Sequence, residues 1–451
     1  MFERVMPEYF AGALWADQTV AHPLGIAALI AALAFLFLVP RRYALLSLIF
    51  IAVALPGAQR IAVFSLDFTF IRIIILGTLL TAAVRGHTRG LRLGLADGLI
   101  GLAALWSLVA GGFLQGGFNG VVSALGDTIN TLGAYLVGRI YIRSLADLHR
   151  LLLWLAAIAV PMLAFFIFEK LTGRNLFGLF GGVPEETMMR NDSLRAQGPF
   201  SHPLMAGVFW ASLLPCLFAL WMARVNSRLY LSVAILCMTL IVVMTASSTP
   251  LVAIALGVFA VAGFIVRRYL RIMIGLAFVG LVGLHFTMEM PVWHLISRID
   301  LSGGSTGWHR YNLIEQSINH FHEWWAFGTL HTGHWGWGLQ DITNQYVLEG
   351  TTGGILQLLL FVALLACIFL QLSNTLRRTR NRASYWLLWG IGASLFVHCV
   401  SFLAVSYFGQ TVPLFYLFLG GAASLTLPLQ RRIRRPPLAR LEEMAPLASP
   451  A

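Results

Sequence analysis

The sequence predicts an all-α, polytopic membrane protein with about twelve or thirteen transmembrane helices. Its mean hydropathy is +0.78, and only 11% of its 451 residues are charged, whereas a soluble domain carries about 25%. Apolar runs long enough to cross ~30 Å of hydrocarbon recur along the chain. The net charge of +12 is typical of arginine-rich cytoplasmic loops in such a protein, so we expect membrane lipids and no nucleic acid as partners.

Thirteen apolar runs define the expected helices. In chain order they are 23–39, 43–56, 61–84, 96–114, 121–142, 148–168, 203–222, 229–247, 250–266, 271–288, 350–372, 385–405 and 411–429. The second run is short and the third contains Asp67 and Arg72, so twelve spans are the alternative. Together the runs predict one integral membrane domain over residues 1–430. We expect residues 431–451, which are basic and rich in proline and alanine, to form a disordered cytoplasmic tail.

Arginine clusters follow every second apolar run. They lie within residues 41–42, 85–92, 143–150, 224–228, 267–271, 377–382 and 431–435. Because basic residues concentrate in cytoplasmic connections, we predict that these connections and the C-terminus are cytoplasmic. The same parity places two long connections, residues 169–202 and 289–349, outside. Functional residues tend to lie in such loops.

The second long loop, before the third-last span, is rich in aromatic and imidazole side chains. Six of the 13 tryptophans and six of the 12 histidines lie there. An interfacial aromatic belt is one explanation of the tryptophans, and the covering of apolar sugar faces is the other. Thr306 resembles an N-cap and Gly328 a C′ residue, which predicts a helix over 307–327. The histidines lack the i, i+4 spacing of a helical zinc motif, and the four cysteines lie in apolar runs, so we expect no metal and no disulfide.

Among the arginines of the two long loops, Arg195 and Arg310 are the stronger evidence of a function, because the distribution of basic residues does not favour arginine on this side of the membrane. Arg195 is in the first long loop and Arg310 is in the second. A guanidinium group presents a planar fork of donors that matches two phosphate oxygens. An anionic ligand is therefore one explanation. The structural alternative is a salt bridge to Glu185, Glu186, Asp192 or Asp300.

Three stretches resemble motifs of the O-antigen ligase and polymerase superfamily. RAQGPFSHPLMAG (195–207) resembles the family's R-x-x-G-x-F-x-H-P stretch, which precedes a span. STGWHRYNLIE (305–315) resembles the start of the outer-loop helix that carries its arginine. NQYVLEGTTGGILQLLLF (344–361) is similar to the H-N-x-Y-L and G-x-x-G element that opens the next span. With the number of spans and the late, large loop, the resemblance covers most of the chain.

The resemblance implies a metal-independent glycosyltransferase of the bacterial inner membrane, with no cofactor and with its active site facing the periplasm. It would take glycan from an undecaprenyl-diphosphate-linked donor and pass it to another lipid-linked glycan, as polymerases do, or to lipid A core sugar, as ligases do. A polymerase of O-antigen or exopolysaccharide is slightly favoured, because Thr343 stands where the family has histidine. The family's Ser-Arg-Gly reads SSTP at 247–250, a difference that we expect to affect packing more than chemistry.

The candidate site residues follow from these motifs. We expect Arg195 and Arg310 to hold the diphosphate and to stabilise its growing charge. Asp341 or His334 would accept the proton of the acceptor hydroxyl, although Asp341 could instead cap the following helix. The residues expected to bind substrate are His202, Asn344, Tyr346, His309 and Arg190.

The rival function is a multi-span transporter or a flippase of lipid-linked oligosaccharide. It predicts ionisable residues paired along a path near the membrane midplane. The residues available for such a path are Asp67, Arg72, Asp127, Arg139 and His398. These ionisable residues are few, and polar residues are concentrated in the two long loops, so we favour the glycosyltransferase.

Overall fold

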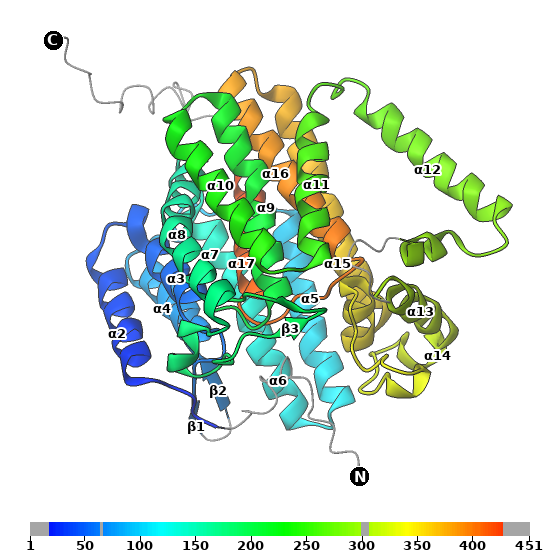
Figure 1. Cartoon of the computed structure of the whole chain (residues 1–451), viewed down its shortest axis with the longest axis horizontal. Helices are drawn as coiled ribbons and strands as arrows, with labels where there is room; N and C mark the ends of the chain where they lie inside the picture. Colours follow the sequence, from blue (N-terminus) through cyan, green and yellow to red (C-terminus); the bar gives the residue numbers. More distant parts are fainter. Residues whose placement is uncertain (1–17, 64–65, 299–305, 427–451) are drawn as a thin grey trace.

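The computed structural model describes residues 18–63, 66–298 and 306–426, which form an almost entirely helical bundle (Figure 1). The α-helices are α2 (Pro23–Leu38), α3 (Ala44–Ala54), α4 (Phe70–Val84), α5 (Leu95–Leu114), α6 (Phe118–Thr128), α7 (Ala134–Tyr141), α8 (Leu145–Thr172), α9 (Pro203–Ala223), α10 (Arg228–Met244), α11 (Ser248–Ala262), α12 (Leu270–Thr287), α13 (Thr306–Asn319), α14 (Phe321–Trp324), α15 (Gln345–Arg378), α16 (Arg382–Ser401) and α17 (Thr411–Thr426). The predicted tail, residues 431–451, lies outside the described residues.

Short elements connect these helices. Two-stranded hairpins are formed by β1 (Arg60–Val63) with β2 (Leu66–Thr69) and by β3 (Met189–Arg190) with β4 (Ser193–Leu194). The short 3₁₀-helices are η2 (Arg41–Tyr43), η4 (Leu176–Phe180), η5 (Val292–Arg298) and η6 (Gly333–Trp335), and η3 (Ile129–Gly133) is a π-helical segment that joins α6 to α7. The all-α class predicted from the sequence is therefore confirmed.

The helices have the lengths and compositions of a multi-pass membrane protein. Among the described residues, six helices are long and apolar enough to cross a membrane: α5, α8, α9, α12, α15 and α16. Five more apolar helices are shorter, with 10–17 residues: α2, α4, α10, α11 and α17. Most of the apolar runs fall on a single helix, and the run 121–142 falls on α6, η3 and α7 together. The expected span 61–84 is helical only from Phe70, because its first part forms the strands β1 and β2. The number of crossings, twelve or thirteen, stays a prediction.

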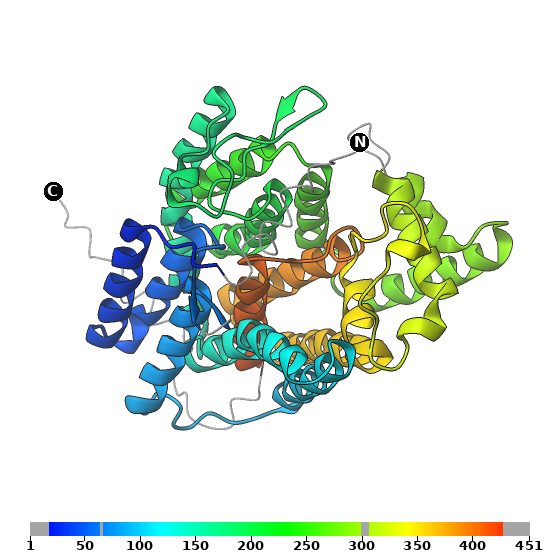
Figure 2. The same cartoon turned by 90° about the horizontal axis from the view of Figure 1, so that it is seen from below.

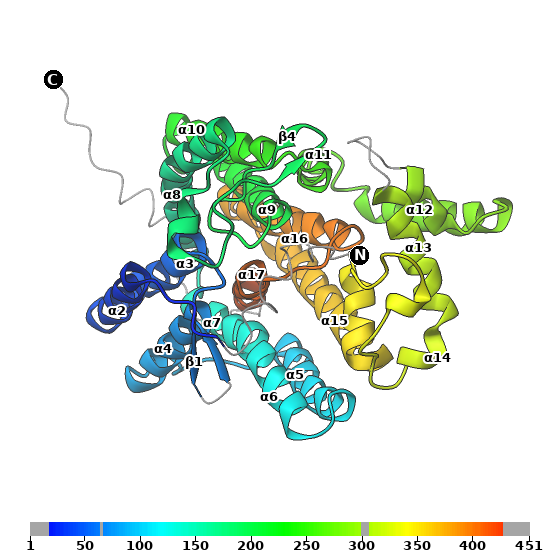
Figure 3. The same ribbon diagram turned by 60° about the horizontal axis from the view of Figure 1, so that its bottom comes forward.

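Helix α9 lies near the centre of the bundle, against α10, α11 and α16 (Figures 1 and 3). The side chain of Trp210, on this helix, is fully buried. Small residues allow close backbone approach, as is common between membrane helices: a Cβ on Gly420 of α17 would lie 2.0 Å from the carbonyl oxygen of Tyr135 on α7. Helix α12 stands away from the bundle in Figure 1 and buries none of its residues.

Arginines at one end of the bundle donate to backbone carbonyls near helix ends. Arg41 Nη2 donates to the oxygen of Ile140 at 2.6 Å, and Arg85 Nη1 donates to the oxygen of Val39 at 2.6 Å. The last carbonyls of a helix lack partners within the helix, so these arginines satisfy them. We call this the arginine end. The two long loops, which contain β3 and α13, lie toward the other end, which we call the loop end (Figures 1 and 2).

The glycines of residues 350–354 break helix α15. Gly353 and Gly354 have non-helical backbone angles, and Gly354 has a φ of +72°. Other parts of the chain bind the polar groups that the break frees: the indole of Trp106 donates to the oxygen of Gly353 at 2.6 Å, and the amide of Ile355 donates to the oxygen of Trp325 at 2.9 Å. Irregular backbone inside a membrane segment is tolerated where protein satisfies it in this way.

The expected helix over 307–327 is two helices. α13 ends at Asn319, and α14 starts two residues later, after His320. The turn between them brings the Trp324 indole back to the oxygen of Ser317, to which it donates at 2.7 Å. Burial of this large ring explains why the helix does not continue. Gly328 then follows with a φ of +102°.

Candidate functional site

Arg195 and Arg310 reach the same place from the two long loops. Arg195 Nη2 donates to Ser247 Oγ at 2.6 Å, and Arg310 Nη2 donates to Thr249 Oγ1 at 3.0 Å. Ser247 is the N-cap of α11, and Thr249 lies in its first turn. A helix N-terminus carries partial positive charge and unpaired amides. Two guanidinium groups and a helix N-terminus are therefore within side-chain reach of one another.

The loop before α9 fixes Arg195. The buried carboxylate of Glu169, in the last turn of α8, accepts from the amides of Gln197 at 3.0 Å and Gly198 at 2.8 Å. Gly198 has a φ of +58°, which favours glycine. Only 5% of Arg195 is exposed. The guanidinium position is thus set by a rigid turn and not by a free loop.

His202 and Arg190 lie on either side of Arg195 in the sequence but differ in environment. His202 is the N-cap of α9, and its Nδ1 accepts from the amide of Leu204 at 3.0 Å. Burial, with the charges of Arg195 and Arg190, lowers the pKa of His202 to about 3. Arg190 is exposed on the β3–β4 hairpin, and Asn191 and Asp192 form its turn with positive φ values, as in type I′ turns. His202 is therefore neutral at pH 7.

Helix α13 carries Arg310 and His309, which contact two connections: the one that follows α16 and the one that precedes α15. Arg310 Nε donates to the oxygen of Ala404, in the α16–α17 connection, at 3.2 Å. The preceding residue, His309, has its Nε2 3.2 Å from the backbone oxygen of Asp341. The structural alternative for the two arginines includes Asp300, which lies outside the described residues. Arg310, His309 and Asp341 are thus brought to one region by tertiary contacts.

The larger of two neighbouring cavities, about 680 Å³, opens beside this region. Its charged lining residues are Arg60, Arg72, Asp127, Asp341 and Glu349. Its polar neutral lining includes side chains from α15 and from the α16–α17 connection: Gln345, Thr352, Gln357, Ser406 and Tyr407. This size is ordinary for a small-ligand site. The two arginines of the long loops do not line it.

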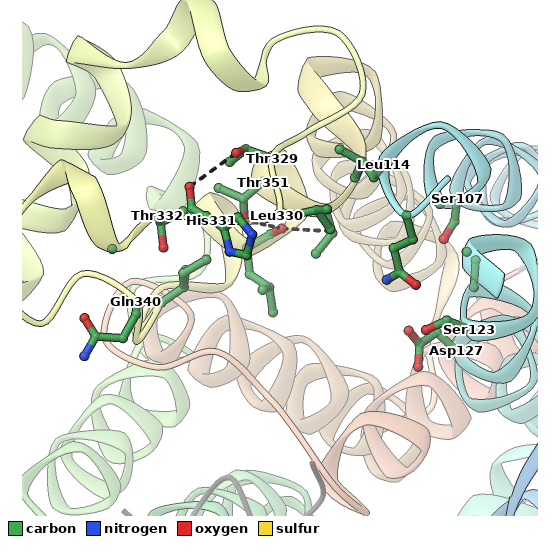
Figure 4. Close-up of a pocket in the computed structure, with 18 of the residues that line it drawn as sticks. Ser107, Leu114, Ser123, Asp127, Thr329, Leu330, His331, Thr332, Gln340 and Thr351 are labelled. Atoms are coloured by element: carbon green, nitrogen blue, oxygen red, sulfur yellow. Dashed lines mark hydrogen bonds between the residues drawn. The ribbon is translucent and has the colours of Figure 1, made fainter. Parts of the chain in front are cut away.

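The second cavity, of about 540 Å³, adjoins the first (Figure 4). The two share six lining residues: Ser107, Asp127, Gln340, Ile342, Leu348 and Thr352. In Figure 4, His331 and Gln340 come from the second long loop, whereas Asp127 lies across the space from them on α6. The shared residues lie on α5, α6, α15 and the loop, so the two cavities adjoin there.

Asp341 lies on the wall of the larger cavity and does not cap the following helix. The cap of α15 is Asn344, whose Oδ1 accepts from the amides of Tyr346 at 2.9 Å and Val347 at 3.2 Å. Partial removal from water raises the pKa of Asp341, and nearby His309 opposes this shift. A raised pKa makes a carboxylate a better base.

Asn344 and Tyr346 make their hydrogen bonds within the protein. Asn344 Nδ2 donates to the oxygen of Leu403 at 3.2 Å, and the Tyr346 hydroxyl donates to the oxygen of Cys399 at 2.9 Å. Neither residue lines the two cavities. We expected both to point at substrate. The structure gives them contacts that fix the start of α15 against the end of α16.

His334 belongs to a separate cluster in the second long loop. Its Nε2 lies 2.8 Å from Glu323 Oε2, which also accepts from the indole of Trp335 at 2.9 Å. These contacts lower the pKa of Glu323, and the hydrogen bond from Trp335 contributes most. His334 is exposed and lines the smaller cavity. Thr343 has a buried hydroxyl without a hydrogen-bond partner among the described residues.

Sequence reasoning did not select three residues of the larger cavity: Gln345, Glu349 and Gln357. Glu349 is a carboxylate on an apolar helix, which is a recognisable sign of function in a membrane protein. The glutamines give no comparable sign. Among the described residues, no group of three or more His, Cys, Asp or Glu side chains is placed to hold a metal ion.

Comparisons with known proteins do not identify the chain. Neither protein-family models nor curated proteins match its sequence.

Proposed function

We propose that the chain is a membrane glycosyltransferase of the O-antigen ligase and polymerase type. Its donor is a glycan linked to undecaprenyl diphosphate, and its product is a longer or transferred surface polysaccharide. The observation that carries the proposal is the convergence of Arg195 and Arg310 on the N-terminus of α11. Phosphate groups bind well at such termini and to paired guanidinium groups. The motif resemblance supports the same conclusion.

In the proposed reaction, an acceptor hydroxyl attacks the anomeric carbon of the donor sugar. The new glycosidic bond forms as the bond from that carbon to the diphosphate oxygen breaks, and undecaprenyl diphosphate leaves. Arg195, Arg310 and the α11 N-terminus stabilise the charge that develops on the leaving diphosphate. Asp341 accepts the acceptor's proton, because its carboxylate lines the cavity and has a raised pKa. His334 is the alternative base.

Under this proposal, the loop end of the bundle faces the periplasm of a bacterial inner membrane. The acceptor is another lipid-linked glycan if the chain is a polymerase, or lipid A core if it is a ligase. Cysteines introduced at Glu186 and His331, both exposed in the structure, test the orientation. An impermeant thiol reagent should label both cysteines in intact cells. Protection of both would show that the loop end faces the cytoplasm and would contradict the proposed orientation.

The glycan phenotype of a deletion strain tests the function. Loss of a polymerase leaves single repeat units, on lipid or on core, without long polysaccharide. Loss of a ligase leaves uncapped core with long glycan still on the lipid carrier. A deletion strain that still makes normal surface polysaccharide contradicts the proposal.

The transporter or flippase remains the second candidate because one ion pair lines the larger cavity. Arg72 Nη2 lies 3.6 Å from Asp127 Oδ1, and both residues are on its wall. A flippase would carry the lipid-linked unit across the membrane. Its loss would therefore leave the accumulated units on the cytoplasmic side, whereas loss of the proposed enzyme leaves them on the periplasmic side.

A further inference from the structure

The larger cavity has more acidic than basic lining groups. Its wall carries two arginines, Arg60 and Arg72, and three acids, Asp127, Asp341 and Glu349. Both arginines are already paired, since Arg60 Nη1 lies 2.9 Å from Asp67 Oδ2 and Arg72 pairs with Asp127. Like charges close together in a partly dry site repel strongly. A diphosphate would therefore be unfavourable here, while a neutral, hydroxyl-bearing ligand would not.

Glu349 is held by two amide groups at the wall of this cavity. Its Oε1 accepts from Gln345 Nε2 at 2.9 Å, and its Oε2 accepts from Gln357 Nε2 at 3.1 Å. The side-chain amide of Gln345 cannot flip, because its Oε1 already accepts from the backbone amide of Tyr407 at 2.8 Å. Glu349 is only 8% exposed. Its carboxylate thus has a fixed orientation.

This arrangement leaves acceptors available for a ligand that donates hydrogen bonds. Each carboxylate oxygen of Glu349 has a second lone pair beyond the one that its glutamine uses. Gln357 Oε1 is buried and has no hydrogen-bond partner among the described residues. A buried acceptor without a partner is costly. A sugar hydroxyl would satisfy such acceptors.

We infer that the larger cavity binds the neutral sugar part of the lipid-linked substrate, with Glu349 accepting a hydroxyl group, and that it excludes the diphosphate. This inference rests on the proposed function. It adds that two parts of the bound substrate occupy two different sites. The diphosphate binds at Arg195 and Arg310, and the sugar ring lies against Glu349, Gln357 and the aromatic residues Phe361, Tyr407 and Tyr416 of the same wall.

Glu349→Gln tests the sugar contact. The side chains have the same shape, and Gln357 can turn its amide so that its oxygen accepts from the new NH₂ group. The substrate is the lipid-linked saccharide extracted from the deletion strain, assayed with the purified full-length protein. Loss of a hydrogen bond to a charged group typically costs ~10–100-fold in binding, so we expect a KM increase of that size with a smaller change in kcat.

A matched control and a rescue make the result specific. Glu289→Gln makes the same chemical change at an exposed position outside both cavities, and its KM should equal that of the wild type. The exchange Glu349→Gln with Gln357→Glu returns a carboxylate to the same wall and should recover part of the loss. An unchanged KM in Glu349→Gln would overturn the inference.

Inorganic pyrophosphate tests the exclusion of the diphosphate. It should inhibit the wild type and Glu349→Gln equally, and Arg310→Lys more weakly. If the cavity held the diphosphate, removal of the negative charge of Glu349 would strengthen inhibition, and that result contradicts the inference. A deletion strain that still makes normal surface polysaccharide would instead overturn the proposed function, and the inference with it.

Discussion

Arg310 donates a hydrogen bond to the hydroxyl of Thr249 over 3.0 Å, which links the second long loop to the first turn of α11. Thr249 lies in the SSTP stretch, residues 247–250, whose departure from a Ser-Arg-Gly motif we expected to affect packing more than chemistry. The contact places this stretch beside both candidate arginines, because Ser247 also accepts from Arg195.

Arg310→Lys should fold normally and lose most activity. Lysine keeps the charge but lacks the planar fork that binds two oxygens. Removal of one group that stabilises transition-state charge costs ~10²–10³ in rate. The loss of activity is measured as the amount of long polysaccharide in a deletion strain complemented with the variant. The amount of variant protein in the membrane is measured in the same cells. Near wild-type product would favour the salt-bridge alternative.

Thr249→Val should reduce activity less, by roughly 10-fold, because it removes one of the acceptors that orient Arg310 and leaves the guanidinium group in place. Thr249→Ser keeps the hydroxyl and is the matched control. The measurement is the rate of polysaccharide formation at equal protein level. Equal rates for the valine and serine variants would show that this hydrogen bond does not position Arg310.

Asp341→Asn should insert and fold but make little product, with a loss of ~10²–10⁴-fold if Asp341 is the base. Asn344 caps α15, so the substitution leaves the cap intact. His334→Ala should be less damaging, since His334 is exposed and bonded to Glu323. The opposite ranking of the two variants would give the base role to the histidine.

Activity should fall as pH falls through the pKa of Asp341. The base must be ionised, and burial raises this pKa above the ordinary value, which is about 3.9 for aspartate. The acid limb of the pH–rate profile should therefore lie at a higher pH than the ordinary pKa of an aspartate would give. This limb should disappear from the residual activity of Asp341→Asn.

Protonation of His202 should destabilise the fold in acid. In the folded protein its pKa is about 3, whereas in the unfolded chain it is about 6.5. Between these values the unfolded state binds the proton and the folded state does not, so stability falls as pH decreases through this window. His202→Asn keeps the N-cap of α9 but not the titration. Its unfolding temperature in detergent should depend less on pH between about 6.5 and 3 than that of the wild type.

Gly354→Ala should impair folding. Gly354 has a φ of +72°, and an added Cβ would lie 2.2 Å from the oxygen of Ala326. With a ψ of −173° this backbone conformation is adopted essentially only by glycine, and it costs ~1–3 kcal/mol for another residue. Gly392→Ala is the control, because a Cβ there meets nothing within 4 Å. Monodisperse yield and unfolding temperature should drop only for the Gly354 variant.

The sequence determined the helical class and the positions of the apolar helices, because a bilayer demands long apolar segments whose backbone groups bond internally. It also singled out Arg195, Arg310 and Asp341, since charged residues in mostly apolar chains are few. It could not show that both arginines contact α11, that Asn344 and not Asp341 caps α15, or that Glu349 faces a cavity between two glutamines. These relations join residues that are far apart in the chain. They depend on how the helices pack, which no local pattern of hydropathy or capping specifies.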